Sequence, residues 1–334
     1  MNEPPVNEPP ASSGRADELR DAIRSRGEAI GFTRVGFASA TEPPGARDAI
    51  LAWLARGHQA SMGWMARDPE RRWEPERILA GARSVIVVSM IYRTTASVPA
   101  GPGLPRISRY AHGRDYHEVM GERLRVLAEE LERLAPGTRT RIACDTSPIA
   151  DKAFAREGGI GWIGKNSCLI HPVDGSFTFL GEIFTDLELP PDPPVRDHCG
   201  SCTRCLDACP TDAFPEPYVL DANRCIAYWN IEHRGPFGPG WSEAIGDWLV
   251  GCDICQDVCP WNRKAPLTDV PDFQPMPSLV ETTLEEWADM GDDEYRARIR
   301  GTAVSRVKPS DMRRNAEAVR ANQEREIDKD GGED

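Results

Sequence analysis

The chain has 334 residues and a formal net charge of −13, and its composition is 40% hydrophobic and 28% charged. This acidic balance argues against a protein that coats nucleic acid indiscriminately. The longest strongly apolar run, SVIVVSMIY at 84–92, is too short to cross a bilayer, and the Pro-rich start lacks the pattern of a secretory signal. We therefore expect a cytoplasmic protein without membrane association, beginning with a disordered tail over 1–14.

Helices and strands alternate in the predicted first domain, which covers 15–189. Helical spacing of apolar residues predicts helices over 15–31, 47–57 and 115–134. β-branched residues predict a buried strand over 84–92, and a short strand is predicted over 141–145. Because no long βαβ repeat is present, we predict a mixed α/β layer domain, of class α/β (α+β).

Two local signals follow in the same domain. Ser147 and Pro148 are typical of a helix start, so a helix is predicted over 148–157. Asp174 and Gly175 are typical of a tight turn, so 167–189 is predicted to form a hairpin.

The second half of the chain divides into three predicted parts. A stiff Pro-rich linker opens a cysteine-rich domain, and a helical basic segment and an acidic tail follow, over 190–265, 266–320 and 321–334. Between 295 and 320, eight Lys or Arg stand against two acidic residues. This pattern favours a solvated helix face, with a phosphate-binding face as the alternative.

Cysteines are concentrated in the second predicted domain, where eight of the ten lie between 199 and 259. A chain without an export signal is not expected to use them as disulfides, so metal binding is the better explanation. One complete C-x2-C-x2-C-x3-C-P run is present, formed by Cys199, Cys202, Cys205 and Cys209 with Pro210. Such a run is typical of ferredoxins that carry two 4Fe-4S clusters.

A second run is incomplete, because Leu249 stands where its first cysteine is expected. Paired runs exchange their fourth cysteines, so the first cluster is predicted to bind Cys199, Cys202, Cys205 and Cys259. Cys225 is the remaining cysteine of the segment, and the second cluster is predicted to bind Cys209, Cys225, Cys252 and Cys255. Two zinc sites are the alternative, although zinc does not need the two x3-C-P endings. Cys144 and Cys168 are expected to be core thiols.

Asp145 is the candidate proton donor, because it ends a predicted strand in a polar, Gly-rich neighbourhood. Capping of the next helix is an equally good explanation for this residue. His112 and His117 are five residues apart, which is poor spacing for one metal on a helix, so surface or capping roles are expected. The loop containing Glu232, His233 and Arg234 lies between cluster cysteines and should be close to the redox path.

Seven segments together resemble the epoxyqueuosine reductases, cobalamin-dependent iron–sulfur enzymes that complete queuosine synthesis in tRNA. The matching segments are MGWMAR (62–67), ISRYAHGRDYH (107–117), DTSPIADKAFAREGGIGWIGKNSCLI (145–170), CGSCTRCLDACPTDAF (199–214), the stretch from Cys225 to IEHRG, GCDICQDVCPWN (251–262) and RGTAVSRVK (300–308). The combination of GWIGKN with the eight-cysteine pattern is the most specific part of this resemblance.

The resemblance implies a cobalamin between the α/β domain and a ferredoxin-like domain with two 4Fe-4S clusters. The clusters would reduce cobalamin to Co(I), which would attack the epoxide carbon of epoxyqueuosine. Asp145 would protonate the departing oxygen, and a second electron and loss of water would leave the alkene of queuosine. The substrate would be tRNA with epoxyqueuosine at the wobble position of the anticodon, and a monomer served by an external electron donor is expected.

The same resemblance implies the remaining site residues. Besides Asp145, the expected cobalamin contacts are Arg67, Tyr110, Lys165, Asn166 and Ser167. The expected tRNA contacts are Arg234 and a basic face over 296–314 that includes Arg306 and Lys308.

Two departures and two alternatives accompany this interpretation. Longer family members continue into a helical-repeat domain that helps to grip tRNA, whereas only 34 residues follow Arg300. DTSP replaces the commoner DSAP, without expected consequence. The alternatives are a reductive dehalogenase, although these usually carry a twin-Arg signal and protonate with Tyr, and a ferredoxin-like electron carrier.

Overall fold

A four-stranded antiparallel sheet forms the centre of the first half of the molecule. The computed structural model describes residues 11–94, 101 and 103–330. The strand order in the sheet is β1 (Arg34–Ser39), β2 (Ser84–Ile91), β7 (Thr178–Thr185) and β4 (Thr140–Ala143). All three pairings are antiparallel, and every residue of β2 is buried, as its β-branched composition favours.

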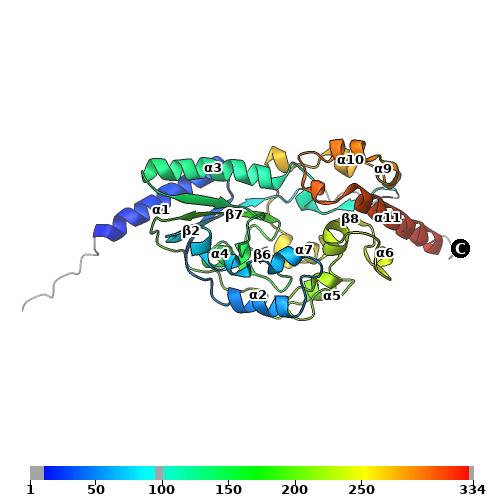
Figure 1. Ribbon diagram of the computed structural model, residues 1–334, viewed down its shortest axis with the longest axis horizontal. Coiled ribbons are helices and arrows are strands. Elements are labelled where there is room, and N and C mark those ends of the chain that lie inside the picture. Colours follow the sequence, from blue (N-terminus) through cyan, green and yellow to red (C-terminus); the bar gives the residue numbers. More distant parts are fainter. Residues whose placement is uncertain (1–10, 95–100, 102, 331–334) are drawn as a thin grey trace, which may run out of the picture.

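Helices cover both faces of this sheet (Figure 1). The helices α1 (Ala11–Ile30) and α3 (Tyr116–Leu134) pack on one face, where apolar side chains such as Leu124 and Leu127 meet Phe37 and Ile183. The short α4 (Asp151–Glu157) packs on the other face through Phe154, with α2 (Ala46–Ala55) beyond it. The predicted mixed α/β layer is therefore confirmed, with an antiparallel sheet.

Short elements shape the cysteine-rich part. They are β3 (Arg106–Ile107), β5 (Trp162–Ile163), β6 (Leu169–Ile170), α5 (Arg204–Asp207), α6 (Trp241–Ala244), β8 (Trp248–Val250) and α7 (Ile254–Asp257). β3 pairs with β8 in parallel and so ties the first half of the chain to the second. A π-helix, η6 (Tyr228–Glu232), follows Cys225.

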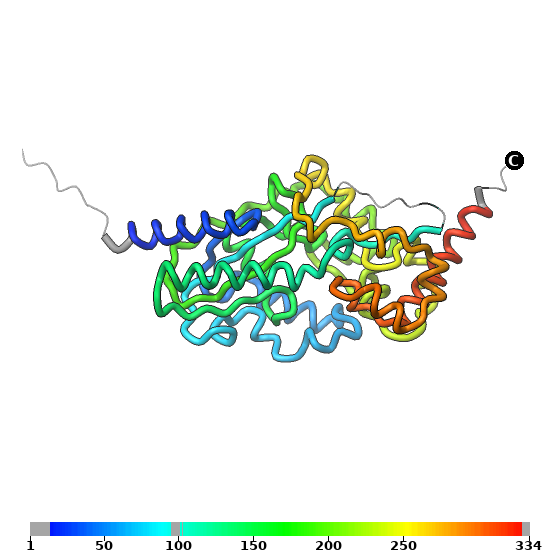
Figure 2. The backbone as a smooth tube through the Cα atoms, turned by 90° about the horizontal axis from the view of Figure 1, so that it is seen from above, coloured from blue at the N-terminus to red at the C-terminus, as the bar shows by residue number. Residues whose placement is uncertain are grey.

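The C-terminal part is helical and has its own core. It contains α8 (Pro277–Val280), α9 (Leu284–Asp289), α10 (Asp292–Arg298) and α11 (Pro309–Asp330). Trp287, Tyr295 and Val319 pack in one apolar cluster with Leu249, so α11 is bound to the cysteine-rich part. The molecule is elongated, with α1 and α11 at opposite ends (Figure 2). Among the described residues, none of the helices is long and apolar enough to span a membrane.

Several predicted boundaries differ from the structure. Of the tail predicted over 1–14, residues 1–10 lie outside the described part, and α1 already begins at Ala11. The helix predicted from 148 begins at Asp151, and its N-cap is Ala150 rather than Ser147. In the predicted acidic tail, α11 continues to Asp330, and 331–334 lie outside the described residues.

The hairpin predicted over 167–189 is wrong. Around the turn at Gly175 only one isolated bridge forms, between His171 and Gly175. β6 pairs with β5, while β7 pairs with β2 and β4 in the central sheet. Burial of the apolar residues of β7 between two layers of helices outweighs the local preference for a hairpin.

Candidate active site and cluster-binding segment

The cysteines predicted for the first cluster meet at one cavity. Cys199, Cys202, Cys205 and Cys259 all line a hollow of about 300 Å³. Burial raises the pKa of Cys205 to about 11, and the neighbouring thiols of Cys259, Cys199 and Cys202 contribute to the rise. The indole nitrogen of Trp162 donates to Cys199 Sγ at 3.5 Å. This arrangement suits four thiolates around one cluster, and the ligand role of each stays a prediction.

The remaining four predicted ligands are also neighbours. Burial raises the pKa of Cys252, and the nearby thiols of Cys225 and Cys209 add to this effect. Cys252 and Cys225 both raise the pKa of Cys255, so the three thiols are near one another, and the use of Cys225 in place of the cysteine missing at 249 stays a prediction. The 16 residues between Cys209 and Cys225 are enough to bring the thiol back.

Cys168, expected to be a core thiol, lies beside this second set. Cys255 donates a hydrogen bond to Cys168, and this bond is the largest cause of the raised pKa of Cys255 and of the lowered pKa of Cys168. Cys144, by contrast, is buried in the core of the first half and donates to the carbonyl of Leu180 at 3.4 Å. The two cysteines outside the predicted ligand set therefore have different surroundings.

The zinc alternative and the cluster prediction differ in how closely their ligands must converge. No three His, Cys, Asp or Glu side chains of the described residues converge on a point where one metal ion could be held. A zinc ion needs its ligands within about 2.3 Å, whereas each thiolate of a cubane cluster binds a different iron.

Asp145 follows the end of β4 and has a strained backbone. Its φ of 46° lies in the left-handed region, which is unusual for a residue with a side chain. Its Oδ2 accepts a hydrogen bond from the Tyr116 hydroxyl at 2.7 Å and lies 2.9 Å from His117 Nε2. Because the side chain is 58% exposed, a ligand can approach the other oxygen.

His117 connects Asp145 to a second carboxylate. Its Nδ1 lies 2.7 Å from Asp115 Oδ1, and Asp115 also caps α3 by accepting from the backbone N–H of His117. Burial lowers the pKa of His117, but the hydrogen bonds to Asp115 and Asp145 outweigh this effect and raise it to about 9. At neutral pH the imidazole is therefore protonated, with one N–H directed at each carboxylate.

The same contacts act on Asp145 in the opposite direction. Burial raises its pKa, but hydrogen bonds from His117 and Tyr116 outweigh that effect, so the pKa falls below the ordinary value. The Tyr116 ring stacks between His117, at a centroid distance of 4.0 Å, and Phe179, at 4.3 Å. This stack fixes both partners of Asp145.

Two buried carboxyl groups lie behind Asp145. Burial raises the pKa of Asp151 to about 7 and that of Glu182 well above its ordinary value, and the charge of Asp145 adds to both. Asp151 Oδ1 and both carboxyl oxygens of Glu182 have no hydrogen-bond partner among the described residues. Buried oxygens without partners are uncommon in proteins and mark a place where a ligand or water can bind.

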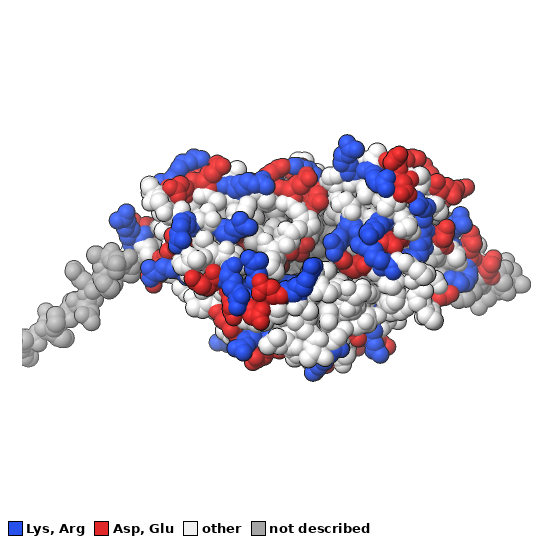
Figure 3. Space-filling model, in the orientation of Figure 1, with Lys and Arg blue, Asp and Glu red and all other residues white. Residues whose placement is uncertain are grey.

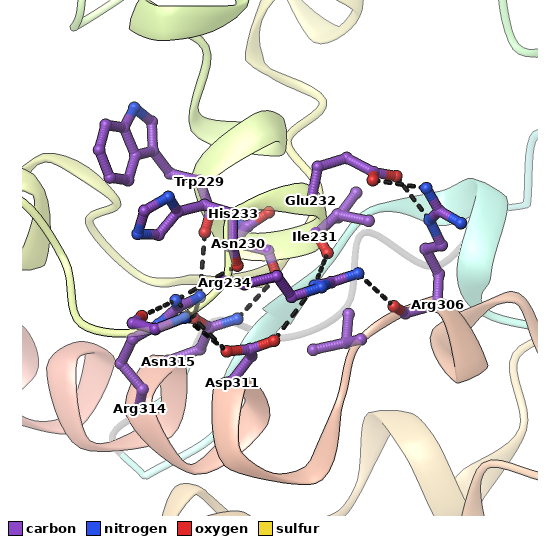
Figure 4. Close-up of polar contacts among 12 residues, drawn as sticks. Trp229, Asn230, Ile231, Glu232, His233, Arg234, Arg306, Asp311, Arg314 and Asn315 are labelled. Atoms are coloured by element: carbon purple, nitrogen blue, oxygen red, sulfur yellow. Dashed lines mark hydrogen bonds and ion pairs between the residues drawn. The ribbon is translucent and has the colours of Figure 1, made fainter. Parts of the chain in front are cut away.

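The rim of the site carries an ion pair. Glu232 is the last residue of the π-helix. Arg306 donates to both of its carboxylate oxygens, at 2.7 and 2.6 Å (Figure 4). Trp64 is 41% exposed and lies 6.0 Å from the Arg306 guanidinium. Hydrogen bonding to Glu232 raises the pKa of Arg306. Asp145 and Tyr110 add to this rise, so both residues are near enough to act electrostatically on the rim.

The residues expected to contact cobalamin occupy different positions. Tyr110 packs edge-on against Tyr116, beside Asp145, and Arg67 is exposed. Lys165 donates to the carbonyls of Gly200 and Cys202, at 2.7 and 3.0 Å, so it holds the first cluster loop. Two further residues bond to nearby loops. The Asn166 side-chain amide donates to Cys255 O at 3.3 Å, and the Ser167 hydroxyl donates to Tyr218 O at 3.1 Å.

The basic segment is largely neutralised within the protein. Arg234 is directed inward, donating to Asp311 Oδ2 at 3.2 Å and to Arg306 O at 3.0 Å (Figure 4). Other arginines pair with acids of α10, and Figure 3 shows basic and acidic side chains interspersed on one face of the molecule. Lys308 is exposed and has no ion pair with any described residue.

Tyr116, His117 and Asp115 are the site residues that sequence reasoning missed. The surface or capping role expected for His117 overlooked its contact with Asp145, 28 residues further along the chain. His112 is buried instead, bonded to Ile107 O at 2.7 Å, and burial lowers its pKa to about 4. The sequence signal that could have found the pair is the Asp-Tyr-His triplet at 115–117, at the start of a helix that faces the strand ending before Asp145.

Comparisons with known proteins agree with this arrangement. One family model, a 4Fe-4S double cluster binding domain, matches residues 198–262, and another, epoxyqueuosine reductase QueG, matches 72–146. A curated epoxyqueuosine reductase of Gloeobacter violaceus is 47% identical over 306 residues, covering 89% of this chain and 94% of the relative. That of Salmonella typhimurium is 38% identical, over 87% of this chain and 77% of its own length.

Solved structures resemble the chain over most of its length. An epoxyqueuosine reductase crystallised with an epoxyqueuosine-modified stem loop of tRNA-Tyr matches with a TM-score of 0.87 and 30% identity, covering 92% of this chain and 82% of that one. The Bacillus subtilis enzyme, with its catalytic aspartate loop swung out of the active site, matches with a TM-score of 0.86 and 28% identity, covering 92% and 82%.

Proposed function

The chain belongs to the epoxyqueuosine reductase family, and we propose from this membership that it reduces epoxyqueuosine to queuosine in tRNA. The observation that carries the proposal is Asp145, held by His117 and Tyr116 in the same chain as a 4Fe-4S double cluster domain. Together they combine a source of electrons with a positioned acid. An epoxide requires both, because its oxygen leaves as water after taking up two electrons and two protons.

Eight thiolates supply the ligands for the electron source in this proposal. Cys199, Cys202, Cys205 and Cys259 hold one cluster, and the other is held by Cys209, Cys225, Cys252 and Cys255. Lys165 and Asn166 hold the cluster loops by donating to their carbonyls. The domain limits that follow are 15–189 for the catalytic part, 190–265 for the clusters and 266–320 for the basic segment.

A cobalamin is the proposed link between the clusters and the substrate. When it is bound and reduced, its cobalt supplies the strong nucleophile that epoxide opening needs. Its peripheral amides can donate hydrogen bonds, and Asp151 Oδ1 is a buried acceptor without a partner among the described residues. We assign cobalamin contacts to Arg67, Tyr110, Lys165, Asn166 and Ser167, of which Tyr110 packs against Tyr116, the hydrogen-bond partner of Asp145.

Asp145 and His117 act as one acid in this proposal. At neutral pH the shared proton resides on His117, and Asp115 orients the imidazole so that Nε2–H faces Asp145. When the epoxide oxygen becomes basic, Asp145 takes the Nε2 proton of His117 and passes it to that oxygen, so one proton is transferred and His117 is left neutral. The second proton, which leaves with water, comes from solvent through the exposed side of Asp145.

The tRNA is proposed to reach Asp145 past Arg306 and Lys308. Arg306 stands on the rim and Lys308 is exposed two residues later, so both can face phosphates. Arg234 supports this rim from behind by donating to Arg306 O. The protein would act as a cytoplasmic monomer without membrane contact, reduced by an external electron donor.

Anaerobic turnover tests the function. The protein is incubated with epoxyqueuosine-tRNA, cobalamin and a chemical reductant, and the nucleosides are identified by mass. Conversion to queuosine is expected; a halogenated aromatic turned over in its place would instead indicate a dehalogenase.

Asp145→Ala tests the acid role. Turnover should fall by roughly 10²–10⁴-fold because a positioned general acid is lost, while clusters and cobalamin remain bound. Asp269→Ala, at an exposed position, is the matched control and should behave as the parent does. Unimpaired turnover of Asp145→Ala would remove this residue from the mechanism.

A further inference from the structure

A second hollow lies on the segment that carries the cluster cysteines. It has a volume of about 620 Å³, and its walls include Arg93, Thr94, Arg109, Asp257, Arg263 and Lys264. Four of these residues are basic and one is acidic. In a chain with a formal net charge of −13, such a concentration of positive charge is a local exception.

Three of the four basic residues in this hollow form no ion pair among the described residues; they are the half-buried Arg93, which donates to Ala265 O, and the neighbouring Arg263 and Lys264. Arg109 is paired with Asp253 and Asp257, at 3.0 and 2.7 Å, so its charge is compensated. Arg263 and Lys264 are exposed and form no ion pair with any other described residue. Their charges are therefore available to an acidic partner.

The hollow is close to both sets of cysteines. Asn262 is one of its lining residues, and its backbone N–H donates to the carbonyl of Cys259 at 3.0 Å. Asp257 is the last residue of α7. In the sequence it lies between Cys255, a predicted ligand of the second cluster, and Cys259, a predicted ligand of the first. Arg204 is an exposed residue of α5, a helix that contacts α7. It lines the other cavity, which contains the four thiols predicted for the first cluster.

A buried hydroxyl also faces this hollow. Thr94 is 5% exposed, and its Oγ1 has no partner among the described residues, although it lines the hollow.

The hollow is separate from the substrate site. Tyr110 packs against Tyr116 on the side of Asp145, whereas the preceding residue, Arg109, lies over the Phe177 ring at 4.9 Å. Phe177 and Arg109 both line the hollow, so the segment of Arg109 and Tyr110 divides the two sites.

We propose that this hollow, with Arg263 and Lys264 in its wall, docks an acidic one-electron carrier protein that reduces the clusters. The inference rests on the proposed function, which needs two electrons from outside for each epoxide. In each encounter the carrier is oxidised by one electron and a cluster is reduced by one, and two encounters supply one turnover. Opposite charges speed such an encounter, and salt weakens the effect.

The test is the rate at which the clusters of the full-length holoprotein are reduced, followed by their absorbance without tRNA. The probe is an acidic plant-type ferredoxin in its reduced form. Dithionite, a small chemical reductant that needs no protein docking surface, is the comparison. R263E/K264E should slow reduction by ferredoxin at least roughly tenfold at low salt, and the difference should shrink as ionic strength rises. Reduction by dithionite should be unchanged in the same variant.

R47E/R133E provides a control with the same change of net charge, at exposed positions on α2 and near the end of α3. It should keep the parent rate with ferredoxin. Equal slowing in both variants, or no slowing in R263E/K264E, overturns the proposal. Tight binding of inorganic pyrophosphate that R263E/K264E abolishes, with an unchanged ferredoxin rate, would assign the hollow to a small phosphate ligand. Dithionite-driven turnover of epoxyqueuosine-tRNA tests the proposed function independently.

Discussion

Single residues around Asp145 decide where its proton is held. The left-handed φ of 46° turns the side chain away from the sheet after β4 ends, and Tyr116 and His117 approach it from the first turn of α3. Their hydrogen bonds lower the pKa of Asp145 and raise that of His117 to about 9. At neutral pH the proton of this pair is therefore held on the imidazole of His117 and not on Asp145.

The pH dependence of turnover follows from this pair. Since the pKa of His117 is raised to about 9, the pair keeps its proton through neutral pH, and turnover should be lost as pH rises through about 9. In His117→Gln the store is absent, so the alkaline fall should move to lower pH and the neutral rate should drop by roughly 10²-fold or more. Rates measured between pH 6 and pH 10 with dithionite check this, and an unshifted profile in His117→Gln would assign the proton elsewhere.

Cys225 and Cys168 offer a matched comparison of two thiols near the second cluster. Cys225 neighbours Cys209, while Cys168 hydrogen-bonds Cys255 without belonging to either predicted set. The parent should contain about eight irons and eight sulfides per chain, and Cys225→Ala about half of each. Cys168→Ala should keep the parent content. Anaerobic iron and sulfide analysis measures both, and full iron content in Cys225→Ala would contradict the ligand assignment.

At the scale of elements, α11 and the π-helix hold the cluster segment in place. Asn315 of α11 donates to Asn230 O at 2.8 Å (Figure 4) and to Leu249 O at 3.0 Å. The side chain of Asn230 in turn donates to Trp248 O and Gly251 O. The irregular backbone between Cys225 and Cys252 thus obtains hydrogen bonds that regular structure does not supply. The C-terminal helix is part of the framework of the site.

Asn315→Ala tests this framework. Asn315 is fully buried, and its loss leaves two buried carbonyls without donors, so the free energy of unfolding should fall by about 2–5 kcal/mol. Arg320→Ala, at an exposed position of the same helix, should change it by less than about 0.5 kcal/mol. Urea unfolding followed by circular dichroism measures both; equal stability of the two variants would show that α11 does not support the segment.

At the scale of the whole molecule, charge is distributed unevenly and mostly compensated. The C-terminal segment looks strongly basic in sequence, yet Arg234, Arg298 and Arg313 are paired with Asp311, Glu294 and Asp292. Two groups of exposed cations are assigned to partners: Arg306, which is paired with Glu232, with Lys308 two residues later, and Arg263 with Lys264, which follow Cys259 in the chain. The acidic remainder of the chain disfavours binding of nucleic acid outside the first group.

The salt dependence of RNA binding distinguishes the group of Arg306 and Lys308 from the group of Arg263 and Lys264. Binding of an unmodified anticodon stem loop of tRNA-Tyr should weaken with salt, and Lys308→Gln should reduce the slope of log Kd against log salt by about 0.7, as expected for one lost phosphate contact. Lys264→Gln should leave the slope unchanged, because its hollow faces a different partner. Fluorescence anisotropy over a range of KCl concentrations provides the slopes, and equal slopes for the parent and Lys308→Gln would remove Lys308 from the interface.

The sequence by itself determined the features that depend on short spacing or on composition. The C-x2-C-x2-C-x3-C-P run indicates a double 4Fe-4S domain, which the family comparison over 198–262 confirms, because the spacing of thiolates along a short turn is itself the geometry of the cluster. The buried strand over 84–92 and the helix over 115–134 were predictable in the same way from periodic burial.

Only the tertiary structure decided which distant side chains share a site. His117 meets Asp145, Cys168 meets Cys255, and Arg234 is directed inward to Asp311, although nothing in the spacing of these residues indicates it. The failed hairpin over 167–189 has the same origin, because β7 gains more by packing in the central sheet than by pairing locally. Local sequence sets the conformation of a few residues, whereas burial between layers selects the contacts that bring distant residues together.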